Sequence, residues 1–147
     1  MIQLSCPNCH TANRIPEERL ADNPVCGSCK QPLLDAVYAM DASMLSQALG
    51  QSTLPVIVDF WAPWCAPCRS FAPTFAAAAH RHGGKLFFVK VDTEAEQAVG
   101  ARFQIRSIPT LAVFQGGEEL GRVSGALPPV QLESLIGNIL QHTEKQA

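Results

Sequence analysis

Six cysteines arranged as C-x-x-C pairs constrain this chain more than any other feature of its sequence. The pairs are Cys6/Cys9, Cys26/Cys29 and Cys65/Cys68. Two of the pairs lie within the first thirty residues, and the third stands alone after a long apolar run. Two intervening residues allow the sulfur atoms of one pair to share a metal ion or to form a disulfide. The pairs therefore divide into an N-terminal set of four cysteines and a separate pair at Cys65 and Cys68.

The first two pairs have the spacing of a structural zinc site. Sixteen residues separate them, which lies within the window for four thiolates around one ion. A segment this short buries too little apolar surface to fold alone, so the metal would supply the missing stability. We expect one Zn²⁺ held by Cys6, Cys9, Cys26 and Cys29. Two disulfides or four free thiols are the alternatives, and His10 is expected to be an exposed polar residue because four sulfurs complete the shell.

Chain length and net charge limit the number of domains and the kinds of partner that the protein can have. The chain has 147 residues and a net charge of -2, enough for one ordinary domain plus a small appendage. This charge argues against a nucleic-acid or anionic-membrane partner, and no apolar run approaches the ~20 residues of a membrane span. The first residues lack a basic segment followed by an apolar core, so we expect no secretory signal and a cytoplasmic location.

We expect a zinc-ribbon-like domain over residues 1–34 and a larger domain over residues 35–147, with a short linker at residues 30–37. The larger domain has the pattern of a βαβαβαββα unit, which predicts an α/β fold with a mixed sheet covered by helices on both faces. Its predicted strands are 36–40, 56–61, 86–91, 110–115 and 119–124. Its predicted helices begin after a cap at Asp41 or Ser43, at Cys65, at a capping box formed by Thr93 and Glu96, and before an apolar stripe at Leu132, Leu135, Ile136, Ile139 and Leu140.

The third pair lies where a buried strand gives way to a helix. A helix N-terminus carries unpaired N–H groups and the positive end of the macrodipole, so a thiol there loses its proton more easily. Cys65 would be the attacking thiolate, and Cys68, one turn further in, would resolve the mixed disulfide. A metal half-site is the alternative, but no second pair remains once the first four cysteines are used. The spacing therefore indicates disulfide exchange.

Asp59 is an acid within the apolar run 56–61. It is either a solvated acid on an exposed strand face or a desolvated carboxyl with a raised pKa that accepts the Cys68 proton. Lys90, the lone charge in the run 86–91, is either the partner of Asp59 or an outward-facing charge. The residues alone leave both pairs of alternatives open.

Three segments resemble the thioredoxin family. Residues 58–68 (VDFWAPWCAPC) resemble its active-site segment, residues 108–110 (IPT) its cis-proline loop, and residues 123–126 (VSGA) its last substrate-contact turn. The likeness covers about residues 36–141, and the four-cysteine segment further resembles the zinc-binding extension of the thioredoxin 2 group. One departure is Ala66, where thioredoxins usually carry glycine.

The resemblance implies the thioredoxin fold and the reduction of protein disulfides, with re-reduction by an NADPH-dependent thioredoxin reductase. It implies that Cys65 is the nucleophile, Cys68 the resolving cysteine, and Asp59 and Lys90 the buried acid and its neighbouring lysine. It also implies an apolar rim that docks an extended client segment, formed by Trp64, Pro67, Ile108, Pro109, Gly125 and Ala126.

We expect no bound organic cofactor and a monomer. Two other functions stay open. One is a zinc-ribbon adaptor or chaperone whose thioredoxin-like domain mainly binds clients. The other is a redox sensor that releases zinc when its cysteines are oxidised. The sequence also does not decide whether the ribbon binds partners or only stabilises the N-terminus.

Overall fold

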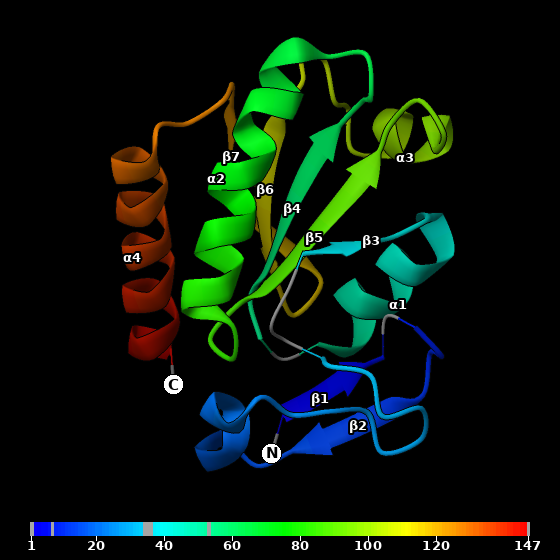
Figure 1. Ribbon diagram of the computed structural model, residues 1–147, viewed down its shortest axis with the longest axis vertical. Coiled ribbons are helices and arrows are strands. Elements are labelled where there is room, and N and C mark those ends of the chain that lie inside the picture. The colour runs from blue at the N-terminus through cyan, green and yellow to red at the C-terminus, as the bar shows by residue number, and fades with distance from the viewer. Residues whose placement is uncertain (1, 7, 34–36, 53, 147) are drawn as a thin grey trace.

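The computed structural model describes residues 2–6, 8–33, 37–52 and 54–146 (Figure 1). In chain order its elements are β1 (Ile2–Ser5), β2 (Ala12–Ile15), the 3-10 helix η1 (Glu17–Asp22), β3 (Tyr38–Ala39), α1 (Ala42–Gln51), β4 (Val56–Trp61), α2 (Ala66–His82), β5 (Phe87–Asp92), α3 (Gln97–Arg102), β6 (Thr110–Gln115), β7 (Glu118–Ser124) and α4 (Pro129–Gln146). No helix within these residues is long and apolar enough to cross a membrane.

The larger sheet has five strands in the order β3-β5-β4-β6-β7. Strands β3, β5 and β4 run parallel, whereas β6 and β7 run antiparallel to their neighbours. Helices α2 and α4 cover one face of this sheet, and α1 and α3 cover the other (Figure 1). The predicted α/β fold with a mixed sheet covered on both faces is therefore confirmed.

Central strand β4 is buried because its side chains pack into both helical layers. Val56, Val58 and Phe60 join the buried cluster on the side of α1 and α3. Ile57 joins the cluster that contains the apolar side chains of α2 and α4. Successive side chains of a strand point to opposite faces, so a strand buried on both faces reads as a continuous apolar run.

The predicted order of elements in the larger domain is correct. The first strand is shorter than predicted, since β3 contains only Tyr38 and Ala39. Residue 36 and the predicted domain boundary at residues 34 and 35 lie outside the described residues. Helix α4 extends past the predicted apolar stripe to Gln146. Asp41 caps α1, because its carboxylate accepts a hydrogen bond of 2.8 Å from the backbone N–H of Met44.

The predicted capping box is wrong. The hydroxyl of Thr93 donates to the carbonyl of Trp61 at 3.1 Å, which ties the turn after β5 to the end of β4. Asp92 instead accepts hydrogen bonds from the backbone N–H groups of Glu94 and Ala95. The Glu96 carboxylate accepts a hydrogen bond from the N–H of Ala42, at the start of α1. Tertiary contacts therefore replaced the local pairing that the spacing suggested.

The N-terminal segment forms a hairpin of β1 and β2 that lies beneath α1 (Figure 1). Its buried side chains do not form a separate core. Cys6, Ile15, Cys26 and Leu33 belong to the same buried cluster as Leu45 and Ala48 of α1. The hydroxyl of Tyr38 donates to the carbonyl of Pro32, and the ring nitrogen Nδ1 of His10 lies 3.1 Å from Oε1 of Gln47. The ribbon is thus packed onto the larger domain.

Because the core is shared, we expect the ribbon and the larger domain to unfold together in one transition. Replacing Ile15, which is 6% exposed, with alanine removes part of a buried side chain from the cluster that the hairpin shares with α1. We expect Ile15→Ala to lower the free energy of unfolding by about 2–5 kcal/mol. Urea unfolding followed by far-UV circular dichroism and by tryptophan fluorescence should show one shifted transition in both signals. The control Val25→Ala, at a ribbon residue 50% exposed, should cost about 0.5 kcal/mol or less. A tryptophan transition unmoved by Ile15→Ala would contradict the shared core.

Candidate active site and metal centre

The dithiol lies at the N-terminus of α2, where β4 and its following turn deliver it. Cys65 is the N-cap residue of this helix, and its Sγ accepts a hydrogen bond of 3.2 Å from the backbone N–H of Cys68. Cys65 and Cys68 form a disulfide. Pro67 occupies the first turn, where the missing N–H has no intrahelical partner to lose. The sequence prediction of a helix opening at the C-x-x-C pair is therefore correct.

A second loop faces Cys65 from across the site. Sγ of Cys65 lies 3.7 Å from the carbonyl oxygen of Ile108, and the Ile108–Pro109 peptide bond is cis. Gly125 donates its N–H to the carbonyl of Pro109 at 2.8 Å, and it adopts a positive φ of 100° that glycine tolerates without strain. Two segments that are far apart in the sequence thus meet at the Cys65 sulfur, and a third is joined to them through Pro109.

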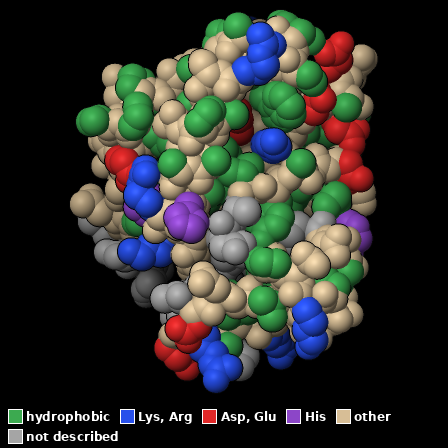
Figure 2. Space-filling view, viewed as in Figure 1, with side chains coloured by type: hydrophobic (Ala, Val, Ile, Leu, Met, Phe, Trp, Pro, Cys, Tyr) green, Lys and Arg blue, Asp and Glu red, His purple; other side chains and the backbone are tan. Residues whose placement is uncertain are grey.

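The six predicted rim residues lie on these three segments, and of the six Ile108 makes the contact with Cys65 Sγ described above. Trp64 is 66% exposed although it is a large apolar side chain. Pro67, Gly125 and Ala126 are also exposed, whereas Ile108 is half-buried and Pro109 is buried. Figure 2 shows hydrophobic side chains exposed at the end of the molecule where α2 begins. By contrast, the two cysteines are only 5% and 2% exposed. The rim therefore offers apolar surface beside a recessed disulfide.

Asp59 is buried, which excludes the alternative of a solvated acid on an exposed strand face. It is 4% exposed, and its Oδ1 has no hydrogen-bond partner among the described residues. Burial raises the pKa of Asp59 to about 7, and the positive charge of Lys90 opposes this shift without cancelling it. By the alternation of β4, Asp59 shares the sheet face of Ile57, which α2 covers. The carboxyl therefore lies beneath the helix that carries Cys68.

Lys90 is the register partner of Asp59 on β5. It is half-buried, and its Nζ lies 5.1 Å from the ring centroid of Trp61, a cation–π distance. No ion pair joins Lys90 to Asp59 in the part of the chain that the structure describes. Lys90 also lines a surface cavity of about 350 Å³ together with Trp61 and Asp92. Lys90 is therefore neither an ion-pair partner of Asp59 nor a fully exposed charge. It is a half-buried positive charge next to Asp59 that has access to solvent.

One contact at the dithiol was not expected from the sequence. Arg69 follows the second cysteine, and its guanidinium donates a hydrogen bond of 2.7 Å to the carbonyl of Pro63. This contact ties the first turn of α2 to the turn that precedes it. A positive charge is unfavourable near a helix N-terminus. An arginine at this position of the sequence therefore indicates that its side chain binds a group outside the helix.

The other four cysteines form a compact cluster. Their sulfur atoms all lie within 4.8 Å of one another, and the pairs Cys6/Cys29 and Cys9/Cys26 are each 3.6 Å apart. Sulfurs around a tetrahedral zinc ion at about 2.3 Å are roughly 3.8 Å apart. The donor set and its spacing therefore fit one Zn²⁺.

Two matching turns present these sulfurs. The first knuckle (Cys6, Cys9 and His10) and the second knuckle (Cys26, Cys29 and Lys30) each close with a backbone hydrogen bond, from His10 to Cys6 and from Lys30 to Cys26. His10 and Lys30 share a φ of 67°. His10 is exposed, as expected.

The surroundings of the four thiols are uneven. Burial raises the pKa of Cys6 to about 11. Hydrogen bonding from the backbone of Cys29, aided by Asn13, lowers the pKa of Cys26 to about 6. The side chains of Asn8 and Asn13 donate to Cys29 and Cys26 respectively. Sequence reasoning missed both asparagines, although a short polar side chain beside a C-x-x-C pair is a recognisable signal.

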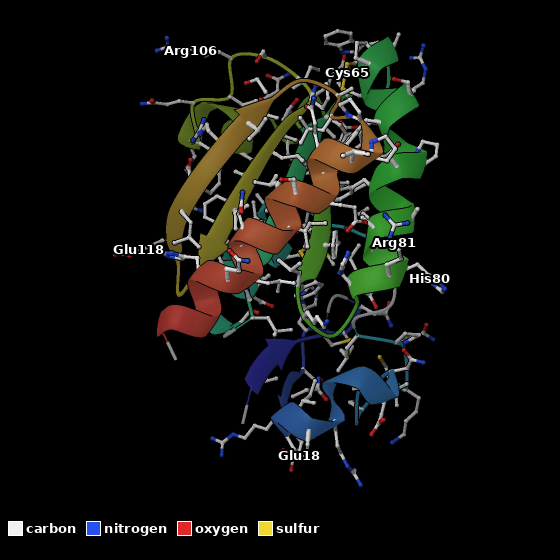
Figure 3. The ribbon with its side chains drawn as sticks, turned by 90° about the vertical axis from the view of Figure 1, so that its left-hand side faces the viewer. Glu18, Cys65, His80, Arg81, Arg106 and Glu118 are labelled. Carbon is white, nitrogen blue, oxygen red and sulfur yellow. A yellow bond between two sulfur atoms is a disulfide. The ribbon has the colours of Figure 1, made fainter. Side chains whose placement is uncertain are left out.

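The two thiol sites lie at opposite ends of the molecule. Figure 3 shows Cys65 at the upper end of the sheet and Glu18 of the ribbon at the lower end, with the helices and strands between them. The cysteines of one site therefore cannot exchange directly with those of the other in one folded chain.

Comparisons with known proteins match both parts of the chain. Residues 36–138 match the family described as Thioredoxin, and residues 5–31 match the family described as Thioredoxin 2, N-terminal. Thioredoxin C-3 of Corynebacterium nephridii is 40% identical over 142 residues, which cover 96% of this chain and 97% of that protein. Thioredoxin 1 of Nostoc sp. is 41% identical over 103 residues, or 70% of this chain and 96% of that protein. The crystal structure of a Malassezia sympodialis thioredoxin aligns with a TM-score of 0.63 and 28% identity, over 70% of this chain and 89% of that chain.

The buried carboxyl makes a prediction about pH. The folded chain holds the Asp59 proton up to about pH 7, whereas the unfolded chain releases it near pH 4. The contribution of Asp59 to wild-type stability therefore falls as pH rises from about 4 to about 7 and stays low above that. In the oxidised protein, we expect Asp59→Asn to raise the free energy of unfolding at about pH 8 by roughly 3–4 kcal/mol, with little effect near pH 4.

Urea denaturation across this pH range measures the difference between variant and wild type. Asp22→Asn, which removes an exposed acid of the ribbon, is the control and should show no comparable gain at high pH. An Asp59→Asn variant whose stability follows the wild-type pH profile would show that Asp59 ionises as an ordinary carboxyl.

Proposed function

The chain belongs to the thioredoxin family and is a thiol–disulfide oxidoreductase that reduces protein disulfides; on that premise we propose which of its residues perform each step. The proposal rests above all on one observation. The Cys65–Cys68 disulfide caps α2 and faces the carbonyl of Ile108 beneath an exposed apolar rim.

In the reduced enzyme, Cys65 attacks the client disulfide. The N-terminus of α2 stabilises the Cys65 thiolate through its N–H groups, including that of Cys68. A bond forms between Cys65 Sγ and one client sulfur, and the other client sulfur leaves as a thiolate. Cys68 then attacks Cys65 Sγ, which releases the second client thiol and leaves the Cys65–Cys68 disulfide. The client gains two electrons and the enzyme dithiol loses two.

Asp59 accepts the proton that Cys68 must lose in the second step. A general base works best when its pKa lies near the working pH, and burial brings the pKa of Asp59 to about 7. Its place under α2 supports this role. Lys90 helps to hold the resulting carboxylate through its positive charge, which opposes the rise in the pKa of Asp59.

The client binds as an extended segment along the rim. The backbone of Ile108 pairs with the client chain, in the manner of an added strand. Trp64, Pro67 and the turn at Gly125 and Ala126 supply apolar contacts on either side. Support for this arrangement comes from the exposure of these residues and from the Gly125–Pro109 hydrogen bond that joins two of the segments.

An NADPH-dependent thioredoxin reductase returns the enzyme to the dithiol form. Family membership supports interaction with a reductase and with disulfide-bonded clients in general. We place the chain in the cytoplasm, because NADPH-coupled reduction and four metal-binding thiolates both require a reducing compartment. The enzyme acts as a monomer, and it uses neither a nucleic-acid nor a membrane partner.

The four remaining cysteines hold one structural Zn²⁺. The fit of the sulfur spacing to a tetrahedral site and the match of residues 5–31 support this role. The ion would fix the two knuckles and so help to stabilise the ribbon against α1. Neither an adaptor nor a zinc-releasing redox sensor is favoured by the comparisons.

Removing each active-site sulfur separates the two steps. We expect Cys65→Ser to abolish insulin reduction coupled to NADPH and thioredoxin reductase, because no attacking thiolate remains. Cys68→Ser should trap mixed disulfides with clients, detectable by non-reducing electrophoresis. Ser70→Ala, which removes an exposed hydroxyl in the same helix, should retain turnover. Normal turnover by Cys65→Ser would end the proposal.

Zinc content tests the metal site. The purified chain should contain one zinc ion per molecule by elemental analysis, and a mercurial reagent should release it. Cys9→Ser, which removes one thiolate ligand, should lower the zinc content sharply, whereas Cys65→Ser should not change it. A reduced wild-type chain that stays free of metal after exposure to Zn²⁺ would contradict this role for the four cysteines.

A further inference from the structure

The side chain of Asn13 joins the two cysteine knuckles. Asn13 lies on β2, just beyond the first knuckle, and it is half-buried. Its Oδ1 accepts a hydrogen bond of 3.0 Å from the backbone N–H of Gly27, inside the second knuckle. Its Nδ2 lies 3.5 Å from Sγ of Cys26 and donates to that sulfur. One side chain from the hairpin therefore makes two contacts with the opposite pair.

The same amide nitrogen is also anchored at the first knuckle. Nδ2 of Asn13 donates a hydrogen bond of 3.0 Å to the carbonyl of Thr11. That carbonyl also accepts the backbone N–H of Cys6 at 2.9 Å, and the Thr11 hydroxyl lies 3.2 Å from Sγ of Cys9. An asparagine side chain has two N–H donors and one carbonyl acceptor, and here all of these functions have partners. The amide is thus fully engaged across the gap between the knuckles.

Asn8 provides a comparison within the same site. Its Nδ2 makes a longer contact of 3.6 Å with Sγ of Cys29, and the side chain is exposed. Its amide makes no second contact with the other knuckle among the described hydrogen bonds. Asn8 therefore reaches the second knuckle through one long, exposed contact, whereas Asn13 makes two contacts with that knuckle and is also held by the carbonyl of Thr11.

We propose that Asn13 is a positioning residue of the metal site, which locks the second knuckle against the first and thereby sets how long zinc is retained. The inference rests on the proposed zinc-binding role of the four cysteines. Asn13 does not touch the metal itself. It acts through the Gly27 backbone, which fixes the turn, and through the Cys26 sulfur, which it orients.

The negative charge of the zinc site is the reason that the N–H donors of Asn13 are expected to matter. Four thiolates carry four negative charges and zinc carries two positive ones, so the loaded site keeps a net charge of -2. N–H groups directed at the sulfurs offset part of that excess. An aspartate at position 13 would keep an acceptor for Gly27, but it would replace both donors with a negative oxygen beside Cys26. Outer-shell changes of this kind typically cost about 10–100-fold in metal affinity.

The experiment measures zinc release from the full-length, zinc-loaded chain into an excess of a chromophoric chelator under reducing conditions. We expect Asn13→Ala and Asn13→Asp to release zinc about tenfold faster or more, with Asn13→Asp the faster of the two. Asn8→Ala should have a clearly smaller effect. Asn138→Asp, an equal charge change at an exposed residue of α4, should release zinc at the wild-type rate.

Two further measurements separate positioning from a loss of folding. The Co²⁺-substituted variants should keep the absorption of a tetrahedral four-thiolate site, because no ligand is removed. Their disulfide reductase turnover should also be retained, since the dithiol lies at the other end of the molecule. Asn13→Asp retains the Gly27 contact and so tests the role of the donors if Asn13→Ala does not fold.

Three results would overturn the proposal in distinguishable ways. Zinc release at the wild-type rate from both Asn13 variants would remove any role for this residue. Equal acceleration by Asn8→Ala and Asn13→Ala would show that the contacts of Asn13 with Gly27 and Thr11 add nothing to donation toward a sulfur. A wild-type chain that binds no zinc would refute the metal site itself, and with it the role of Asn13.

Discussion

The N-cap of α2 is the interaction on which the active site depends. Cys65 ends the turn after β4 and receives the N–H of Cys68, so the same sulfur that starts the helix is the one placed for chemistry. Strand β4 can deliver it reliably because it is buried on both faces and paired on both edges. The Ile108 loop and the Gly125 turn then complete the surroundings. The reactive sulfur is therefore positioned by the buried central strand of the sheet.

The burial of this strand also raises the pKa of Asp59. A carboxyl in the central strand loses its hydration, and Lys90 lies too far away to form an ion pair with it. The buried carboxyl lowers the free energy of unfolding above neutral pH. It also gives Asp59 a pKa suited to accepting the proton of Cys68, its proposed partner. At the other end of the molecule, the ribbon contributes buried side chains to the core beside α1 while keeping its own thiols away from the dithiol.

Much of this organisation could be predicted from the sequence because its strongest signals are local. Apolar runs located β4 and β5, and cysteine spacing separated the two thiol sites. What could not be predicted depends on contacts between distant segments. Thr93 bonds to Trp61 instead of forming a capping box, and Asn13 bridges two turns that are remote in sequence. The burial of Asp59 also required the complete sheet and helix α2.

The central claim is that one chain keeps two thiol sites with separate tasks, reversible oxidation at Cys65/Cys68 and metal retention at the four ribbon cysteines. A redox titration of the zinc-loaded protein against glutathione, with the dithiol state and the bound zinc measured at each point, tests it most directly. The account predicts a single two-electron transition at Cys65/Cys68, with zinc retained throughout. Zinc lost in proportion to the oxidation of Cys65 and Cys68 would contradict it.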